Sequence, residues 1–190
     1  MSMQKAAMEV QAETRVMNET AALLRDMVNE PNGDLSIPFN RYSKSLDQLV
    51  TAAKRTENTG KSVEQKSAAY LQAWEQQVQT IDYQHIRDLS EARRSEVTNR
   101  VEAINRRYRE SQAAIQPLIS YFEDIRKALS ADLTVDGLNS LKGVTQNAQA
   151  NVAKVQTALD SLSAELTNSS TLLSSVAYHE QQNSHAVSQP

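Results

Sequence analysis

The sequence VTNRVEAINRRYRESQAAIQPLISYFEDIRKAL, residues 97–129, decides the fold of this chain. Its apolar residues follow one another in alternating steps of four and three residues, and Ser111 fills the only polar position of the series. The apolar members are Val97, Val101, Ile104, Tyr108, Ile115, Leu118, Phe122, Ile125 and Leu129. A period of about 3.5 residues puts them on one face of an α-helix, as in a coiled coil. The segment therefore predicts a long helix that packs lengthwise against other helices.

The same period recurs on both sides of this segment and predicts four helices, at about residues 3–29, 37–81, 84–130 and 135–177. The breaks between them are short, which makes consecutive helices antiparallel. We expect Ser36, Asp82 and Thr134 to cap the second, third and fourth helix. The predicted fold is all-α: an elongated antiparallel bundle of three long helices plus a shorter N-terminal helix. Residues 1–178 would form a single domain, and the polar, aperiodic residues 179–190 a disordered tail.

Pairing the helices about their turns predicts which residues meet. Gly60 falls beside Tyr108, and Phe122 falls opposite Thr145, so that large residues meet small ones. The first helix reaches back over residues 39–65 only. We therefore expect four helices at one end of the bundle and three at the other, where Tyr70, Trp74 and Ile81 would form an exposed apolar strip. Such a strip favours self-association, most simply as a symmetric dimer.

Composition excludes several classes of function. The 190 residues carry a net charge of -3 with both signs interspersed, which gives no drive toward nucleic acid. The chain has no cysteine, so it has neither disulfides nor thiol chemistry. No stretch approaches the roughly 20 apolar residues of a membrane span. The first ten residues, MSMQKAAMEV, contain no signal-peptide hydrophobic region.

No residue set indicates catalysis. The three histidines, His85, His179 and His185, have no acid or helical partner at metal-ligand spacing, and none lies on a packing face. The Glu-x-x-His pattern of di-iron bundles is absent. We therefore predict a non-enzymatic protein with no metal, no cofactor and no small-molecule substrate.

Two groups of residues are candidates for an interaction surface. Tyr70 and Trp74 lie on the predicted packing face, where a core role is the more common one. Arg93, Arg100 and Arg107 recur every seven residues and form one stripe beside the packing face of the third helix. The simpler interpretation of this stripe is structural: the aliphatic stems cover the core edge while the guanidinium groups pair with acids of a neighbouring helix. The alternative is that the stripe meets an anionic surface.

The chain resembles the bacterial DUF2959 family over most of Val10 to Leu173. The resemblance is carried by Phe39 to Leu49, by Tyr70 to Trp74, by Ile86-Arg87-x-x-Ser90, by Ala114-Ile115-Gln116-Pro117-Leu118 with Phe122, and by Leu138 to Leu141. Members of this family look like exported proteins, often with a lipoprotein signal. The resemblance thus implies a periplasmic or outer-membrane-anchored protein, with the cytoplasm as the alternative location. It implies no activity.

Two hypotheses about function follow. The first is a structural or protein-interaction bundle of the bacterial envelope, which presents a long surface to another protein or to a second copy of itself. The second is a membrane-surface module similar to the curved BAR-type bundles, which also use long antiparallel helices. Binding to anionic lipid vesicles that salt abolishes would favour the second hypothesis.

Overall fold

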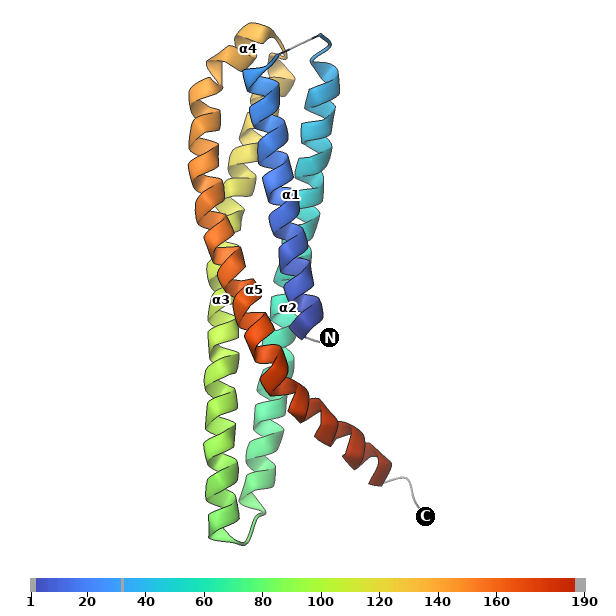
Figure 1. The fold of residues 1–190 in the computed structure, drawn as a ribbon, viewed down its shortest axis with the longest axis vertical. Coiled ribbons are helices and arrows are strands. Elements are labelled where there is room, and N and C mark those ends of the chain that lie inside the picture. Colours follow the sequence, from blue (N-terminus) through green and yellow to red (C-terminus); the bar gives the residue numbers. More distant parts are fainter. Residues whose placement is uncertain (1–2, 32, 187–190) are drawn as a thin grey trace.

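The computed structural model describes the backbone of residues 3–31 and 33–186, and side chains up to Ser170. Over these residues the chain is helical, with no strand. The helices are α1 (Met3–Asn29), α2 (Ser36–Gln79), α3 (Gln84–Ala131), α4 (Val135–Ser140) and α5 (Lys142–Ala186). The predicted all-α bundle of long helices is therefore confirmed. Figure 1 shows the long helices running side by side along one axis.

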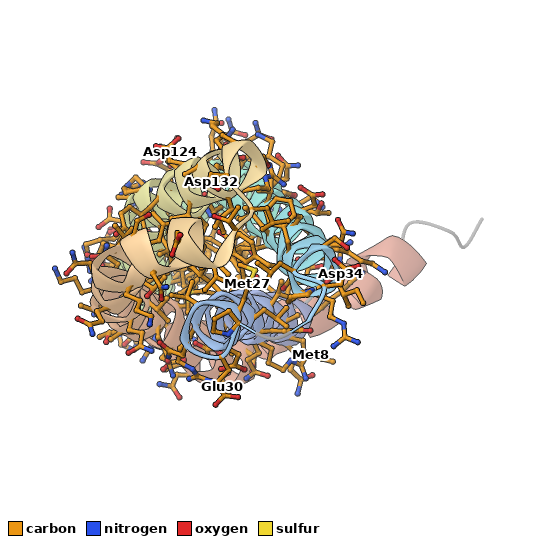
Figure 2. All side chains as sticks on the ribbon, turned by 90° about the horizontal axis from the view of Figure 1, so that it is seen from above. Met8, Met27, Glu30, Asp34, Asp124 and Asp132 are labelled. Carbon is orange, nitrogen blue, oxygen red and sulfur yellow. The ribbon has the colours of Figure 1, made fainter. Side chains whose placement is uncertain are left out.

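The long helices pack in a ring in which α1 contacts α2, α2 contacts α3, α3 contacts α5, and α5 closes back on α1. This order makes two layers, one of α2 with α3 and one of α1 with α5 (Figure 1). Viewed along the bundle axis, Met27 points to the middle of the ring, whereas the carboxylates of Glu30 and Asp124 lie at its rim (Figure 2). The core therefore sits between the layers, along the axis.

The predicted packing face of α3 is buried along its whole length, from Val97 to Leu129, including Ser111. The face of α1 is buried at Val10, Met17 and Leu24, each at most 1 % exposed. In α5 the predicted face is buried from Thr145 to Ser169. Leu173 and Val176 lie beyond the described side chains. The heptad period thus located the core of these helices correctly.

The pairing of α2 with α3 also agrees with the prediction. A side chain at Gly60 would meet the ring of Tyr108, with a Cβ only 2.8 Å from Tyr108 Cδ1. About four turns of α3 further from the hairpin turn, the Tyr42 and Phe122 rings meet edge to face, with centroids 6.4 Å apart, and the Tyr42 hydroxyl donates to the Phe122 carbonyl at 2.7 Å. On the other side of α3, the Tyr121 hydroxyl donates to the carbonyl of Val144, one residue from the predicted partner of Phe122.

The predicted fourth helix over 135–177 is wrong in one respect, because the structure divides it into α4 and α5 at Leu141. Gly137 explains the position of α4: a side chain there would collide with the backbone carbonyl of Asp132, so α4 lies tight against the end of α3. Leu138 is fully buried and closes this end of the core. The Thr134 hydroxyl accepts from the Gly137 N–H at 3.1 Å, which confirms the predicted cap.

Helix α5 continues to Ala186, past the predicted end at residue 177, and residues 187–190 of the predicted tail lie outside the described residues.

Two other predicted caps are wrong. Ser36 is the first residue of α2, and its N–H donates to the Asp34 carboxylate at 2.9 Å. The Ser36 hydrogen bonds, from its side chain first and its backbone second, lower the pKa of the Asp34 carboxyl. At α3 the N-cap is Tyr83 rather than Asp82, with no side-chain capping bond. At α2, the Asp34 carboxylate thus satisfies the free N–H of the first helical residue, Ser36.

Candidate interaction surface

The candidate surface lies on the part of the α2–α3 hairpin that extends past the start of α1. We call residues 61–96 the hairpin end. Within these residues, all of which the structure describes, Val78 is the only fully buried side chain. Figure 1 shows the hairpin continuing beyond Met3 while the last part of α5 turns away from it. The predicted fourth helix, seen as α5, therefore does not run along this end, and the expectation of three helices there is corrected to two.

The turn of the hairpin is fixed by hydrogen bonds. Arg87 donates from Nε and Nη2 to the carbonyl of Ile81, at 3.1 and 2.6 Å. The N–H groups of Thr80 and Ile81 bond back to the carbonyls of Gln77 and Val78. These bonds satisfy backbone groups that the end of α2 would otherwise leave free. The tip is thus an ordered turn.

Tyr70 and Trp74 form an aromatic pair on the packing face of α2. Their rings meet edge to face with centroids 5.6 Å apart, and the Trp74 indole N–H donates to the Ser90 hydroxyl of α3 at 3.0 Å. Tyr70, Trp74 and Ile81, the residues of the predicted exposed strip, are partly buried rather than exposed. Tyr70 and Trp74 therefore lie on the predicted packing face, but no further helix covers them as it would cover core residues.

Three large apolar side chains near the turn are exposed. Tyr83 is 77 % exposed, Ile86 53 % and Leu89 59 %. Leu89 directly precedes Ser90, the acceptor of the Trp74 hydrogen bond. Single exposed apolar residues are ordinary, but three of them near one turn of the hairpin that carries a partly buried aromatic pair are typical of a binding surface.

The three arginines of the predicted stripe lie along α3, from Arg93 in the hairpin end to Arg107 in the part of the bundle where α1 and α5 also pack, which we call the four-helix part. Arg93 pairs with Glu96 at 2.7 Å and Arg107 with Glu110 at 2.8 Å, each three residues further along the same helix. Arg100 is partly buried. The expectation that the stripe pairs with acids of a neighbouring helix is thus corrected at Arg107. Ile86 lies seven residues before Arg93, so the stripe leads directly to the exposed apolar residues.

Other arginines, which the sequence analysis did not single out, join α3 to α2. Arg94 lies 3.6 Å from Glu75, Arg109 3.3 Å from Glu64 and Arg126 2.6 Å from Asp47. The sequence contained a signal for the role of Arg94: this residue lies seven residues before Val101 and so falls on the packing face of α3. Because these pairs are largely exposed, each contributes less than about 1 kcal/mol. They guide how α2 and α3 align rather than stabilise the bundle strongly.

A groove of about 290 Å³, lined in part by Gly60 and Tyr108, opens between α2 and α3. Salt bridges flank it, and two of its amide atoms, Asn105 Oδ1 and Gln112 Nε2, have no protein partner. The groove is lined by no histidine, serine, threonine or cysteine. Among the described residues, no group of three or more His, Cys, Asp or Glu side chains could hold a metal ion. His85 is exposed in the first turn of α3, and the side chains of His179 and His185 lie outside the described ones.

A polar layer crosses the four-helix part of the core. Glu13 is fully buried, and neither of its carboxyl oxygens has a hydrogen-bond partner among the described residues. Burial raises the pKa of the Glu13 carboxyl, and the Thr56 hydroxyl beside it opposes this only in part. One layer along, the Thr20 and Ser45 hydroxyls bond to each other at 2.8 Å. Sequence analysis missed Glu13, although its place between Val10 and Met17 on the α1 packing face was visible.

Fold and surface together define a helical-bundle protein with an uncovered hairpin. The chain belongs to the family described as "Protein of unknown function (DUF2959)", which it matches over residues 2–175, so the resemblance is confirmed. No curated protein and no solved structure matches the chain. Within the part of the chain that the structure describes, no helix is long and apolar enough to cross a membrane.

Proposed function

We propose that this protein is a non-enzymatic structural or protein-interaction bundle whose hairpin end binds a protein partner. One observation carries the proposal: the packing face of α2 continues past Gly60 with the same period but without covering helices. An apolar face that a partner covers loses its contact with water, at about 25 cal/mol for each Å² buried. Tyr70 and Trp74 are residue types that commonly dominate binding energy at protein interfaces.

The location that we propose is the bacterial envelope, either the periplasm or the outer membrane with a lipid anchor. It is the location that the resemblance implied, and the absence of cysteine from these 190 residues is compatible with the oxidising periplasm. Fractionation of cells with an antibody against the protein tests this proposal. Recovery of the protein with cytoplasmic markers would contradict it.

Site-specific crosslinking in living cells tests the interaction. A photoreactive residue replaces Leu89 in one strain and Asp124, exposed at the other end of the bundle, in a control strain. We expect a discrete protein adduct from position 89 and none from position 124. The adduct must be identified and reproduced with the two purified proteins. Absence of any protein adduct along positions 83, 86 and 89 would contradict the proposal.

The second candidate function, a membrane-surface module, is favoured by a specific arrangement: Ile86 and Arg93 begin a stripe in which apolar and basic residues adjoin. Sedimentation with vesicles that contain anionic lipid, at low and at high salt, distinguishes the two functions. Binding that disappears at high salt would support the membrane function. We expect none at either salt concentration.

A further inference from the structure

We propose that the hairpin end binds the hairpin end of a second copy, antiparallel to the first, so that two α2–α3 hairpins form a four-helix segment at the centre of a symmetric dimer. The inference rests on the proposed function and names its partner. Four observations support the inference: the helices that cover the α2–α3 face elsewhere in the chain, and the charge, the surroundings and the size of the hairpin end.

The same face of the α2–α3 layer is covered within the chain wherever α1 and α5 are present. Tyr42, Leu46 and Leu49 are fully buried there, whereas Tyr70 and Trp74 on the continuing face are not. A suitable cover is a pair of antiparallel helices with the same heptad period, as the α1 and α5 pair shows. The hairpin end of a second copy is itself such a pair.

Charge permits this pairing. Residues 61–96 carry five Lys or Arg and six Asp or Glu, so two copies of the hairpin end do not repel each other. Both signs occur on both helices: Lys66 and Glu75 on α2, Arg87 and Glu91 on α3. A two-fold dimer therefore brings side chains of both signs together rather than like charges alone.

The space around the hairpin end is compatible with an antiparallel partner and not with a parallel one. The layer of α1 and α5 stands on the same face, and α1 begins at Met3, beside the base of the hairpin end. A parallel partner would place its own α1 and α5 in the space of this layer. An antiparallel partner places its four-helix part beyond the tip of the hairpin, where Figure 1 shows no backbone of residues 3–31 and 33–186.

The size of the face is sufficient. Lys61 to Gln79 is 19 residues of helix, about 28 Å long, and two helices side by side are about 20 Å wide. The face therefore projects to about 560 Å², close to the roughly 600 Å² per partner at the lower end of specific complexes. Tyr70 is the middle residue of the α2 part. Antiparallel pairing places it and Trp74 at the two-fold axis, where dominant binding residues commonly lie.

Light scattering of the full chain at tens of micromolar tests the dimer. The test variant is Ile86→Glu with Leu89→Glu, and the control is Met8→Glu with Val135→Glu, which changes equally exposed apolar residues elsewhere. We expect a dimer for the wild type and the control, and a dissociation constant at least tenfold higher for the test variant. Circular dichroism should show the same helix content for all three proteins, because none of the changed residues is buried.

Spin labels test the arrangement, and the absence of native cysteine makes single labels specific. One protein is labelled at the tip, Tyr83→Cys, and another at the middle of the hairpin end, Gln72→Cys. Antiparallel pairing predicts a tip-to-tip distance of about 28 Å or more and a clearly shorter distance between the middle labels. A shorter distance at the tip than at the middle would mean end-to-end contact and would overturn the inference.

A full chain that stays monomeric at tens of micromolar overturns the inference as well. If a chain that ends at Ser170 dimerises while the full chain does not, residues 171–190 cover the face instead. A monomeric purified protein that still gives the adduct at position 89 with a different protein would refute the second copy as partner and leave the proposed function standing.

Discussion

Two stretches of α2 with the same heptad period have different environments. From Tyr42 to Gly60 the packing face is buried, whereas from Val63 to Trp74 it is only partly covered. The period fixes which side of a helix packs. It does not fix how many helices pack there, because that depends on where other segments of the chain end. The heptad pattern thus identifies an apolar helix face but does not show whether other helices cover it.

The largest expected effect is in the covered stretch. Phe122 is fully buried and contacts the Tyr42 ring, so Phe122→Ala should destabilise the protein by about 3–5 kcal/mol, measured by urea denaturation. The matched change in the uncovered stretch, Trp74→Ala, should cost clearly less in the monomer. Equal losses at the two sites would show that the hairpin end is as well packed as the four-helix part.

The next effect concerns the contact between Gly60 and Tyr108. A methyl group at Gly60 would lie 2.8 Å from the Tyr108 ring, so Gly60→Ala should destabilise by about 1–2 kcal/mol, after about 1 kcal/mol of gained helix propensity. The control is Gly143→Ala, which meets no atom within 4 Å and should stabilise by up to about 1 kcal/mol. Thermal unfolding of both variants measures the difference in sign. Stabilisation by both would mean that α2 and α3 are further apart than described.

A third prediction concerns pH. Because the pKa of Glu13 is raised above 4.5 in the folded protein, the folded state holds this proton more tightly than the unfolded chain does. Stability should therefore fall as the pH rises from about 4.5 through the raised pKa and then level off. Glu13→Gln should remove this fall and leave the variant more stable than the wild type above that range. Chemical denaturation from pH 4.5 to 8 measures it, with Glu110→Gln as the exposed control; the same profile for Glu13→Gln and wild type would contradict the buried carboxyl.

The smallest effect belongs to the arginine stripe. We expect Arg93→Gln, Arg100→Gln and Arg107→Gln together to lower stability slightly, by less than about 1 kcal/mol for each exposed ion pair lost. Vesicle binding should be absent before and after the change. Native stability combined with loss of a measurable binding to anionic vesicles would instead assign the stripe to a membrane contact.

The sequence predicted the core well, because a 3.5-residue period depends on local spacing alone. It predicted the pairing of Gly60 with Tyr108, because short turns leave little freedom to antiparallel helices. It did not predict the break at Leu141, which depends on the close approach of Gly137 to Asp132. The sequence analysis also expected the predicted fourth helix to pack beside Trp74. That helix, α5, is long enough to reach the hairpin end, but its last part does not run alongside it.

The ring order has a consequence for the time course of folding. Each of the contacts α1–α2, α2–α3 and α3–α5 joins segments that follow one another in the chain, with only the short α4 between the last two, so these hairpins can form while the protein is being synthesised. Only the contact of α1 with α5 joins the first helix to the last. Until α5 leaves the ribosome, α1 and α3 each lack a neighbour, and the apolar side of the incomplete ring is open to other nascent chains. A chaperone that protects such surfaces would therefore be needed most during synthesis of residues 142–170.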